Sequence, residues 1–144
     1  MTYKSTDELL KILKSTKTTS ELRDYTDSLA SENTPCSFSD FINTEILNRQ
    51  IPVASLISLS QIQRNYAYQI LDGRRNPSRD KVLAICLALN LDFTKTQRAL
   101  TLSNNSQLYS KRKRDSILIF ALEKHLSVQN TNELLFDMNE LPLS

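Results

Sequence analysis

The side chains best suited to chemistry in this sequence lie close together, between residues 63 and 71. They are polar groups that can form planar hydrogen bonds or stack on a base: Gln63, Arg64, Asn65, Tyr68 and Gln69. In a helix, residues four positions apart share a face, so Arg64 neighbours Tyr68 and Asn65 neighbours Gln69. Arginine can donate two parallel hydrogen bonds to guanine, and glutamine or asparagine can pair with adenine. Side chains of these types can therefore pair with base edges, and the same pattern also suits the solvated face of an amphipathic helix.

Positive charge is concentrated around the same segment. Residues 62–81 hold five basic and two acidic side chains, a net charge of +3, and residues 111–115 hold another +3. The remaining stretches carry −2 (residues 1–61), +1 (82–110) and −3 (116–144). Such a distribution is typical of a phosphate-facing surface, although either stretch alone could be a solvated polar face.

Four cations follow residues 63–71 at positions that suit phosphate binding: Arg74, Arg75, Arg79 and Lys81. Phosphate contacts fix the register of a protein on the duplex without reading its sequence. Lys111 to Arg114 could add further phosphate contacts or form a solvated loop, whereas Tyr66 is expected to pack inside the protein rather than to contact DNA.

Helical periodicity predicts the elements that position these side chains. A short helix at 53–59 is followed by a tight corner at Ser60 and Gln61 and by a buried Ile62. The helix at 63–71 has an apolar side and ends at Asp72, where the only glycine of the chain, Gly73, suits a left-handed residue. Ser78 is expected to cap the next helix, in which the apolar stripe is Val82, Ile85, Cys86 and Leu89.

The same periodicity extends over most of the chain. A capping box at Ser5 and Glu8 predicts a first helix, and a second is expected at about 20–31. A third begins near Ser37, with Phe38, Phe41, Ile42 and Ile46 toward the core, and Pro52 suits a first helical position. A helix carrying Phe93, Thr96, Ala99 and Leu100 closes the central region. Two further helices are expected: one begins at Arg114, and the other is capped by Ser127.

Composition supports an all-α fold. The chain has 144 residues, of which 40% are hydrophobic and 24% charged, as in ordinary globular proteins. No segment alternates apolar and polar residues as a strand would. No apolar run is long enough to span a bilayer, and no secretory signal is evident near the start, so we expect a cytoplasmic protein without a membrane partner. Cys86 is expected to be a core residue.

The order of these features resembles the phage-repressor-like (XRE type) helix-turn-helix family of transcriptional regulators. The resemblance covers about 65 residues and rests on three linked segments: IQRNYAYQILDG at 62–73, RRNPS at 74–78 and LALNL at 87–91. In that family the second helix of the pair lies in the major groove, which implies that residues 63–71 read base edges in double-stranded DNA. Where the family commonly has glycine at the corner, this chain has Gln61. The family's first helix often begins with a phosphate-binding glutamine, and this chain has Pro52, Val53 and Ala54 there.

The sequence therefore predicts an all-α, repressor-like helix-turn-helix bundle with added helices at both ends. We expect a helical extension at 1–36, the DNA-binding domain at 37–103, and a helical pair at 111–144. The pair either packs on that domain or forms a homodimer interface. The alternative function is a protein-binding module on the same scaffold, such as an antitoxin, an antirepressor or an inhibitor of another macromolecule.

Catalysis is not expected. One glycine cannot build a phosphate-binding loop, and no Ser/His/Asp set, carboxylate pair or metal-ligand spacing is present. The single histidine, His125, falls at a helix end. The sequence indicates no cofactor, no metal and no small-molecule ligand.

Overall fold

The computed structural model describes residues 10–11, 13–14, 18–23 and 37–144. The chain divides into two compact units, Met1–Cys36 and Ser37–Ser144. In the first unit, residues 10–11, 13–14 and 19–23 are helical, and Thr18 Oγ1 accepts a hydrogen bond from Glu21 N at 3.1 Å. The capping box expected at Ser5 and Glu8 lies outside the described residues, as does most of the helix expected at 20–31.

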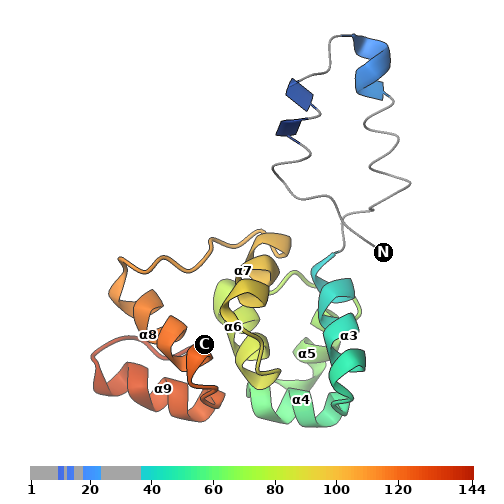
Figure 1. The fold of residues 1–144 in the computed structure, drawn as a ribbon. Coiled ribbons are helices and arrows are strands. Elements are labelled where there is room, and N and C mark those ends of the chain that lie inside the picture. The colour runs from blue at the N-terminus through green and yellow to red at the C-terminus, as the bar shows by residue number, and fades with distance from the viewer. Residues whose placement is uncertain (1–9, 12, 15–17, 24–36) are drawn as a thin grey trace. The chain divides into compact units, whose positions relative to one another are not determined.

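The second unit is built from helices, and no strand occurs in the described ranges. The all-α prediction is confirmed. Its helices are α3 (Phe38–Arg49), α4 (Val53–Ser60), α5 (Arg64–Leu71), α6 (Arg79–Ala88), α7 (Phe93–Leu102), α8 (Lys113–Glu123) and α9 (Val128–Asp137). In Figure 1, α3, α4 and α5 lie on one side of α6 and α7, and α8 and α9 lie on the other.

Serine and aspartate side chains at the start of four helices explain where these helices begin. Ser37, Ser78, Asp92 and Ser127 each accept a hydrogen bond from the backbone N–H three residues later. Each cap satisfies a donor that the helix leaves unpaired and contributes about 1 kcal/mol. The caps expected at Ser78 and Ser127 are confirmed. Pro52 precedes α4 as its N-terminal cap residue, one position earlier than expected.

Left-handed backbone ends several helices although glycine is scarce. Gly73 has φ +85°, as its position after α5 predicted. Among the described residues, six others have positive φ: Gln50, Gln61, Asn90, Asn104, His125 and Asn139. Three of them are asparagine, which tolerates this region better than most residues. Gln61, at the α4–α5 corner, adopts φ 59° and carries the backbone strain expected where glycine is missing.

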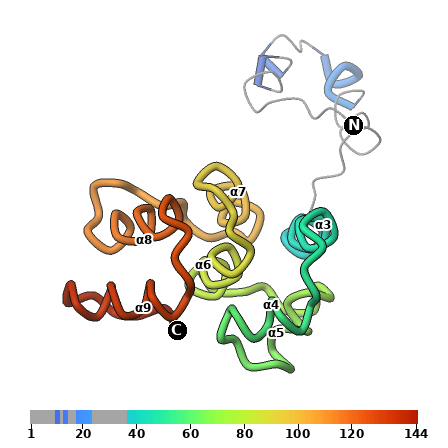
Figure 2. The backbone as a smooth tube through the Cα atoms, turned by 60° about the horizontal axis from the view of Figure 1, so that its bottom comes forward, coloured from blue at the N-terminus to red at the C-terminus, as the bar shows by residue number. Residues whose placement is uncertain are grey.

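The core of Ser37–Ser144 surrounds α6. The expected stripe of Val82, Ile85, Cys86 and Leu89 is buried, and so are Leu83, Ala84, Leu87 and Ala88. After its charged first turn this helix is apolar on all sides, and α4, α7 and α9 all pack against it (Figure 2).

The C-terminal helices pack on the rest of their own unit. Helix α8 contacts α7, α9 contacts α6, and the two helices contact each other. Two ion pairs join α6 to α8. Arg79 of α6 pairs with Asp115 of α8 at 2.9 Å, and Asp80 of α6 pairs with Arg114 of α8 at 3.0 Å. The pair at 111–144 therefore belongs to the same compact unit as residues 37–103.

Candidate nucleic-acid interface

The corner between α4 and α5 fixes the direction of α5. Ser60, buried at the end of α4, donates its hydroxyl to Ile57 O at 2.8 Å and accepts a hydrogen bond from Ile62 N at 3.3 Å. Ile62 is buried, as predicted, together with Ala67 and Ile70 on the inner side of α5. At the other end of α5, Asn43 of α3 donates its amide to Leu71 O at 2.8 Å. Both ends of α5 are thus attached to the bundle.

The outer side of α5 carries the predicted base-reading side chains. Arg64, Asn65 and Tyr68 are exposed, and Gln69 is partly exposed. The guanidinium of Arg64 stands over the ring of Tyr68, 5.7 Å from its centroid. Within the described part of the chain, the side chains of Arg64 and Asn65 make no hydrogen bond or ion pair. Their donors and acceptors are therefore available to a partner.

Gln63 is the N-terminal cap of α5 rather than its first residue. Its Oε1 accepts a hydrogen bond from Tyr66 N at 2.8 Å. The side chain is exposed, but its carboxamide oxygen already has a partner in the protein. Gln63 keeps its amide N–H groups for contacts outside the chain.

Arg74, in the turn after α5, is paired locally. Its Nε donates to Asp72 Oδ2 at 2.6 Å, and its backbone N donates to Asp72 Oδ1 at 3.0 Å. The side-chain hydrogen bond with Arg74 lowers the pKa of Asp72, and the same bond raises the pKa of Arg74. The Arg74 side chain remains 68% exposed, so its charge is accessible although Asp72 offsets it.

Arg75 and Lys81 meet at the ring of Tyr66. The Arg75 guanidinium lies 5.3 Å from the ring centroid and Lys81 Nζ lies 5.7 Å from it. Arg75 also donates its Nε–H to Gln69 Oε1, and its backbone N donates to Gln69 O at 3.1 Å. Tyr66 thus brings a cation of the turn and a cation of α6 together beside α5. Sequence reasoning assigned Tyr66 to packing and missed this role; the signal for it was an aromatic residue among nearby cations.

Arg79 lies apart from this group, contrary to the expectation that it holds phosphate. Its two terminal nitrogens bind both carboxylate oxygens of Asp115 at 2.9 Å, and it also donates to the carbonyls of Ser106 and Gln107. Its side chain is only 22% exposed. Since its donors are occupied inside the protein, we leave Arg79 out of the interface.

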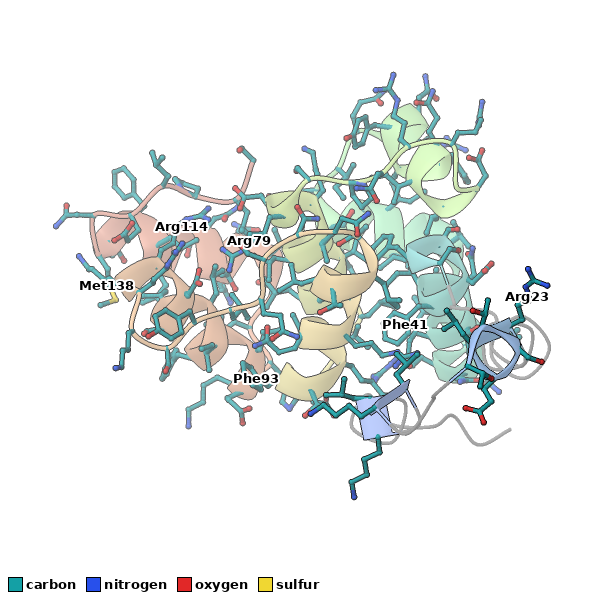
Figure 3. All side chains as sticks on the ribbon, turned by 90° about the horizontal axis from the view of Figure 1, so that it is seen from above. Arg23, Phe41, Arg79, Phe93, Arg114 and Met138 are labelled. Carbon is teal, nitrogen blue, oxygen red and sulfur yellow. The ribbon has the colours of Figure 1, made fainter. Side chains whose placement is uncertain are left out.

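The basic stretch at 111–114 is also partly used inside the protein. Arg114 binds both carboxylate oxygens of Asp80 at 3.0 Å, and Lys113 donates to Met138 O at 2.6 Å. Figure 3 labels Arg79 and Arg114 where α6 meets the C-terminal helices. Lys111 and Arg112 are exposed.

Hydrogen bonds explain the acidity of Asp115. Burial alone would raise its pKa, but hydrogen bonds from Arg79 and from Tyr109 N outweigh burial, and the charges of Arg79 and Arg112 add to them. The pKa of Asp115 therefore lies below its ordinary value. The carboxylate is held in its charged form as part of the fold.

Other kinds of site find little support in the described ranges. No group of three or more His, Cys, Asp or Glu side chains there could hold a metal ion. Cys86 is fully buried and unpaired, as expected of a core residue, and burial raises the pKa of its thiol to about 12. None of the described helices combines the length and apolar character required to cross a bilayer.

Comparison with known proteins does not extend these observations: no protein-family model, curated protein or solved structure matches the chain.

Proposed function

We propose that this protein is a sequence-specific double-stranded DNA-binding transcriptional regulator. In this proposal α4 and α5 form a helix-turn-helix pair, and the segment at 63–71 enters the major groove. The family resemblance noted above points the same way, but the proposal rests on the side chains of α5. The proposal places the protein in the compartment that holds the DNA, which we take to be the cytoplasm.

The observation that carries the proposal is the two-sided character of α5. Its inner side, with Ala67 and Ile70, is buried in the bundle, and its outer side presents Arg64 and Asn65 without a hydrogen bond or ion pair in the described part of the chain. A short helix attached at both ends and carrying unpaired planar hydrogen-bonding groups matches the requirement for reading base edges.

Accessible cations beside α5 suit the phosphate backbone. Arg74, Arg75 and Lys81 follow α5 closely, and Arg75 and Lys81 share the ring of Tyr66. Cations held by an aromatic ring lose less side-chain freedom when they bind, which favours affinity. With Arg79 used in the fold, these three side chains form the proposed phosphate-binding group.

We also propose that the protein acts as a homodimer. An apolar groove of about 550 Å³ lies between α8 and α9. It is lined by Lys113, Ser116, Ile117, Phe120, Leu134 and Met138. Phe120 is 50% exposed and borders the hollow, so the same surface offers both a groove and a side chain that could enter it. A two-fold interface needs such self-complementarity, and two copies would read two half-sites.

A protein-binding module remains the second candidate because part of the expected phosphate-binding apparatus is absent. Pro52 at the start of α4 makes no side-chain cap hydrogen bond, and Arg79 is occupied by Asp115. An antitoxin, antirepressor or inhibitor on this scaffold would use the same exposed surface without a preference for a base sequence.

Selection from a random duplex pool separates the two candidates. The wild type is compared with the double variant Arg64→Ala/Gln69→Ala. If the protein is a regulator, the wild type enriches a DNA motif and the double variant does not. A palindromic motif would also support a dimer. Weak, salt-sensitive binding without enrichment would contradict the regulator and leave the protein-binding module.

A further inference from the structure

Two glutamines of the proposed interface have their carboxamide oxygens engaged inside the protein. Gln69 Oε1 accepts the Nε–H of Arg75, and Gln63 Oε1 accepts Tyr66 N–H at 2.8 Å. A guanidinium and a backbone N–H can only donate, so the atom that faces each of them must be the amide oxygen. The amide nitrogens, which only donate, are left for an external partner.

This arrangement changes which base Gln69 suits. A glutamine that pairs with adenine accepts a hydrogen bond from the N6 amino group and donates one to N7. The oxygen of Gln69 keeps a second lone pair, but the positively charged guanidinium of Arg75 stands beside it. That guanidinium has donors of its own and disfavours a base edge that presents an amino group. Guanine presents two acceptors, O6 and N7, in the major groove.

Arg75 is held in position for such a contact. Three interactions fix it: the hydrogen bond to Gln69 Oε1, the backbone hydrogen bond to Gln69 O at 3.1 Å, and the ring of Tyr66 at 5.3 Å. Its terminal nitrogens make no hydrogen bond to the residues that the structure describes. Gln69 and Arg75 together form a positively charged unit, which we call the Gln69–Arg75 pair. Its remaining N–H groups donate, and its one side-chain acceptor, the oxygen of Gln69, already receives the Nε–H of Arg75.

We propose that the Gln69–Arg75 pair recognises guanine through O6 and N7. This inference rests on the proposed function and makes it more specific: Gln69 does not read adenine, and Arg75 contributes to base recognition rather than serving only as a phosphate contact. Arg64, which also only donates, suits the same kind of base edge.

Four proteins in the duplex selection test the inference. Gln69→Ala identifies the base pair that depends on Gln69. The wild type then reports which base is preferred there, and Arg75→Ala reports whether Arg75 sets that preference. Arg74→Ala is the matched control, since it removes the neighbouring arginine, which is paired with Asp72 instead. Arg75 is exposed, so its replacement leaves the core intact.

The expected result is guanine at the base pair that depends on Gln69. Replacing that guanine by 7-deazaguanine, which lacks the N7 acceptor, should weaken wild-type binding about tenfold. In Arg75→Ala the preference should be lost or should shift to adenine, because the oxygen of Gln69 is then free. Arg74→Ala should bind all sequences somewhat less tightly and keep the guanine preference.

Three outcomes would overturn the inference while leaving DNA recognition in place. They are adenine at the base pair that depends on Gln69, a preference unchanged by Arg75→Ala, or no base pair that depends on Gln69. A wild type that enriches no motif would instead contradict the proposed function itself, and the inference with it.

Discussion

Arg79 and Asp115 form a bidentate ion pair that joins the first turn of α6 to the first turn of α8. Both contacts measure 2.9 Å, and the Asp115 side chain is almost completely buried. The pair links residues 36 positions apart and uses a cation whose place in the sequence suggests a DNA contact. The contribution of this pair to the free energy of unfolding can be measured without DNA.

Asp115→Asn should destabilise the protein by about 3 kcal/mol, because it leaves the largely buried guanidinium of Arg79 without its counter-charge. Chemical denaturation measures the free energy of unfolding. Asp137→Asn, an exposed substitution at the end of α9, is the control and should change it by less than about 0.5 kcal/mol. Equal stability of the two variants would show that the Arg79–Asp115 pair contributes little to the fold.

The stability of the wild type should depend on pH through Asp115. Its pKa is lowered in the folded protein, so its ionised form contributes stability fully above the ordinary aspartate pKa of about 3.9. That contribution is lost as the pH falls through the lowered value. Denaturation curves between pH 5 and pH 2 should show a smaller loss of stability in Asp115→Asn than in the wild type. Parallel pH profiles would contradict this assignment.

The two left-handed residues that flank α5 should respond in opposite ways to substitution. Gln61→Gly should stabilise the protein by about 0.5–1 kcal/mol, because it relieves the backbone strain at φ 59°. The greater conformational freedom of glycine in the unfolded chain offsets part of this gain. Gly73→Ala should destabilise it by about 1–2 kcal/mol because φ is +85° and an added Cβ would lie 3.3 Å from Ser39 Oγ.

Thermal or chemical denaturation of both variants checks this pair of predictions. Ser58→Gly, inside α4, is the control for glycine as such and should cost about 0.5 kcal/mol. A Gln61→Gly variant as unstable as Ser58→Gly would contradict the left-handed corner.

Phe120→Glu should convert the proposed homodimer to a monomer, because it places a charge in the apolar groove between α8 and α9. Phe136→Glu is the matched control: Phe136 is 71% exposed on α9 but does not line the groove. Light scattering measures the molar mass. A wild-type monomer, or a dimer that survives Phe120→Glu, would contradict the proposed dimer surface.

Local sequence signals predicted most of the helix boundaries correctly. Ser78 and Ser127 cap the helices that they were expected to cap, the helix expected near Ser37 begins at Phe38, and Gly73 is left-handed as its place after α5 requires. These features depend on residues within one helical turn, so a sequence pattern contains the information needed. Pro52 differs from the prediction by one position: it precedes α4 instead of being the first residue of that helix.

Long-range partners could not be predicted in the same way. Arg79 looked like an exposed cation because its partner Asp115 and the carbonyls at Ser106 and Gln107 come from segments far along the chain. The burial of residues 82–88 on every side of α6 depends in part on α9, which packs against α6 from a distant part of the chain. The engagement of the Gln69 oxygen by Arg75 likewise depends on how the turn after α5 folds back.

Arg64→Ala tests the central claim most directly, through the binding of the selected duplex and of a scrambled duplex at the same salt concentration. The wild type should bind the selected duplex about a thousandfold or more tightly than the scrambled one. Arg64→Ala should lose about 1–3 kcal/mol on the selected duplex and little on the scrambled one, because a base contact contributes only where the base is correct. Lys111→Ala, which removes the same charge from an exposed loop, is the control. Equal losses on both duplexes, or a wild type without preference, would contradict base recognition by α5.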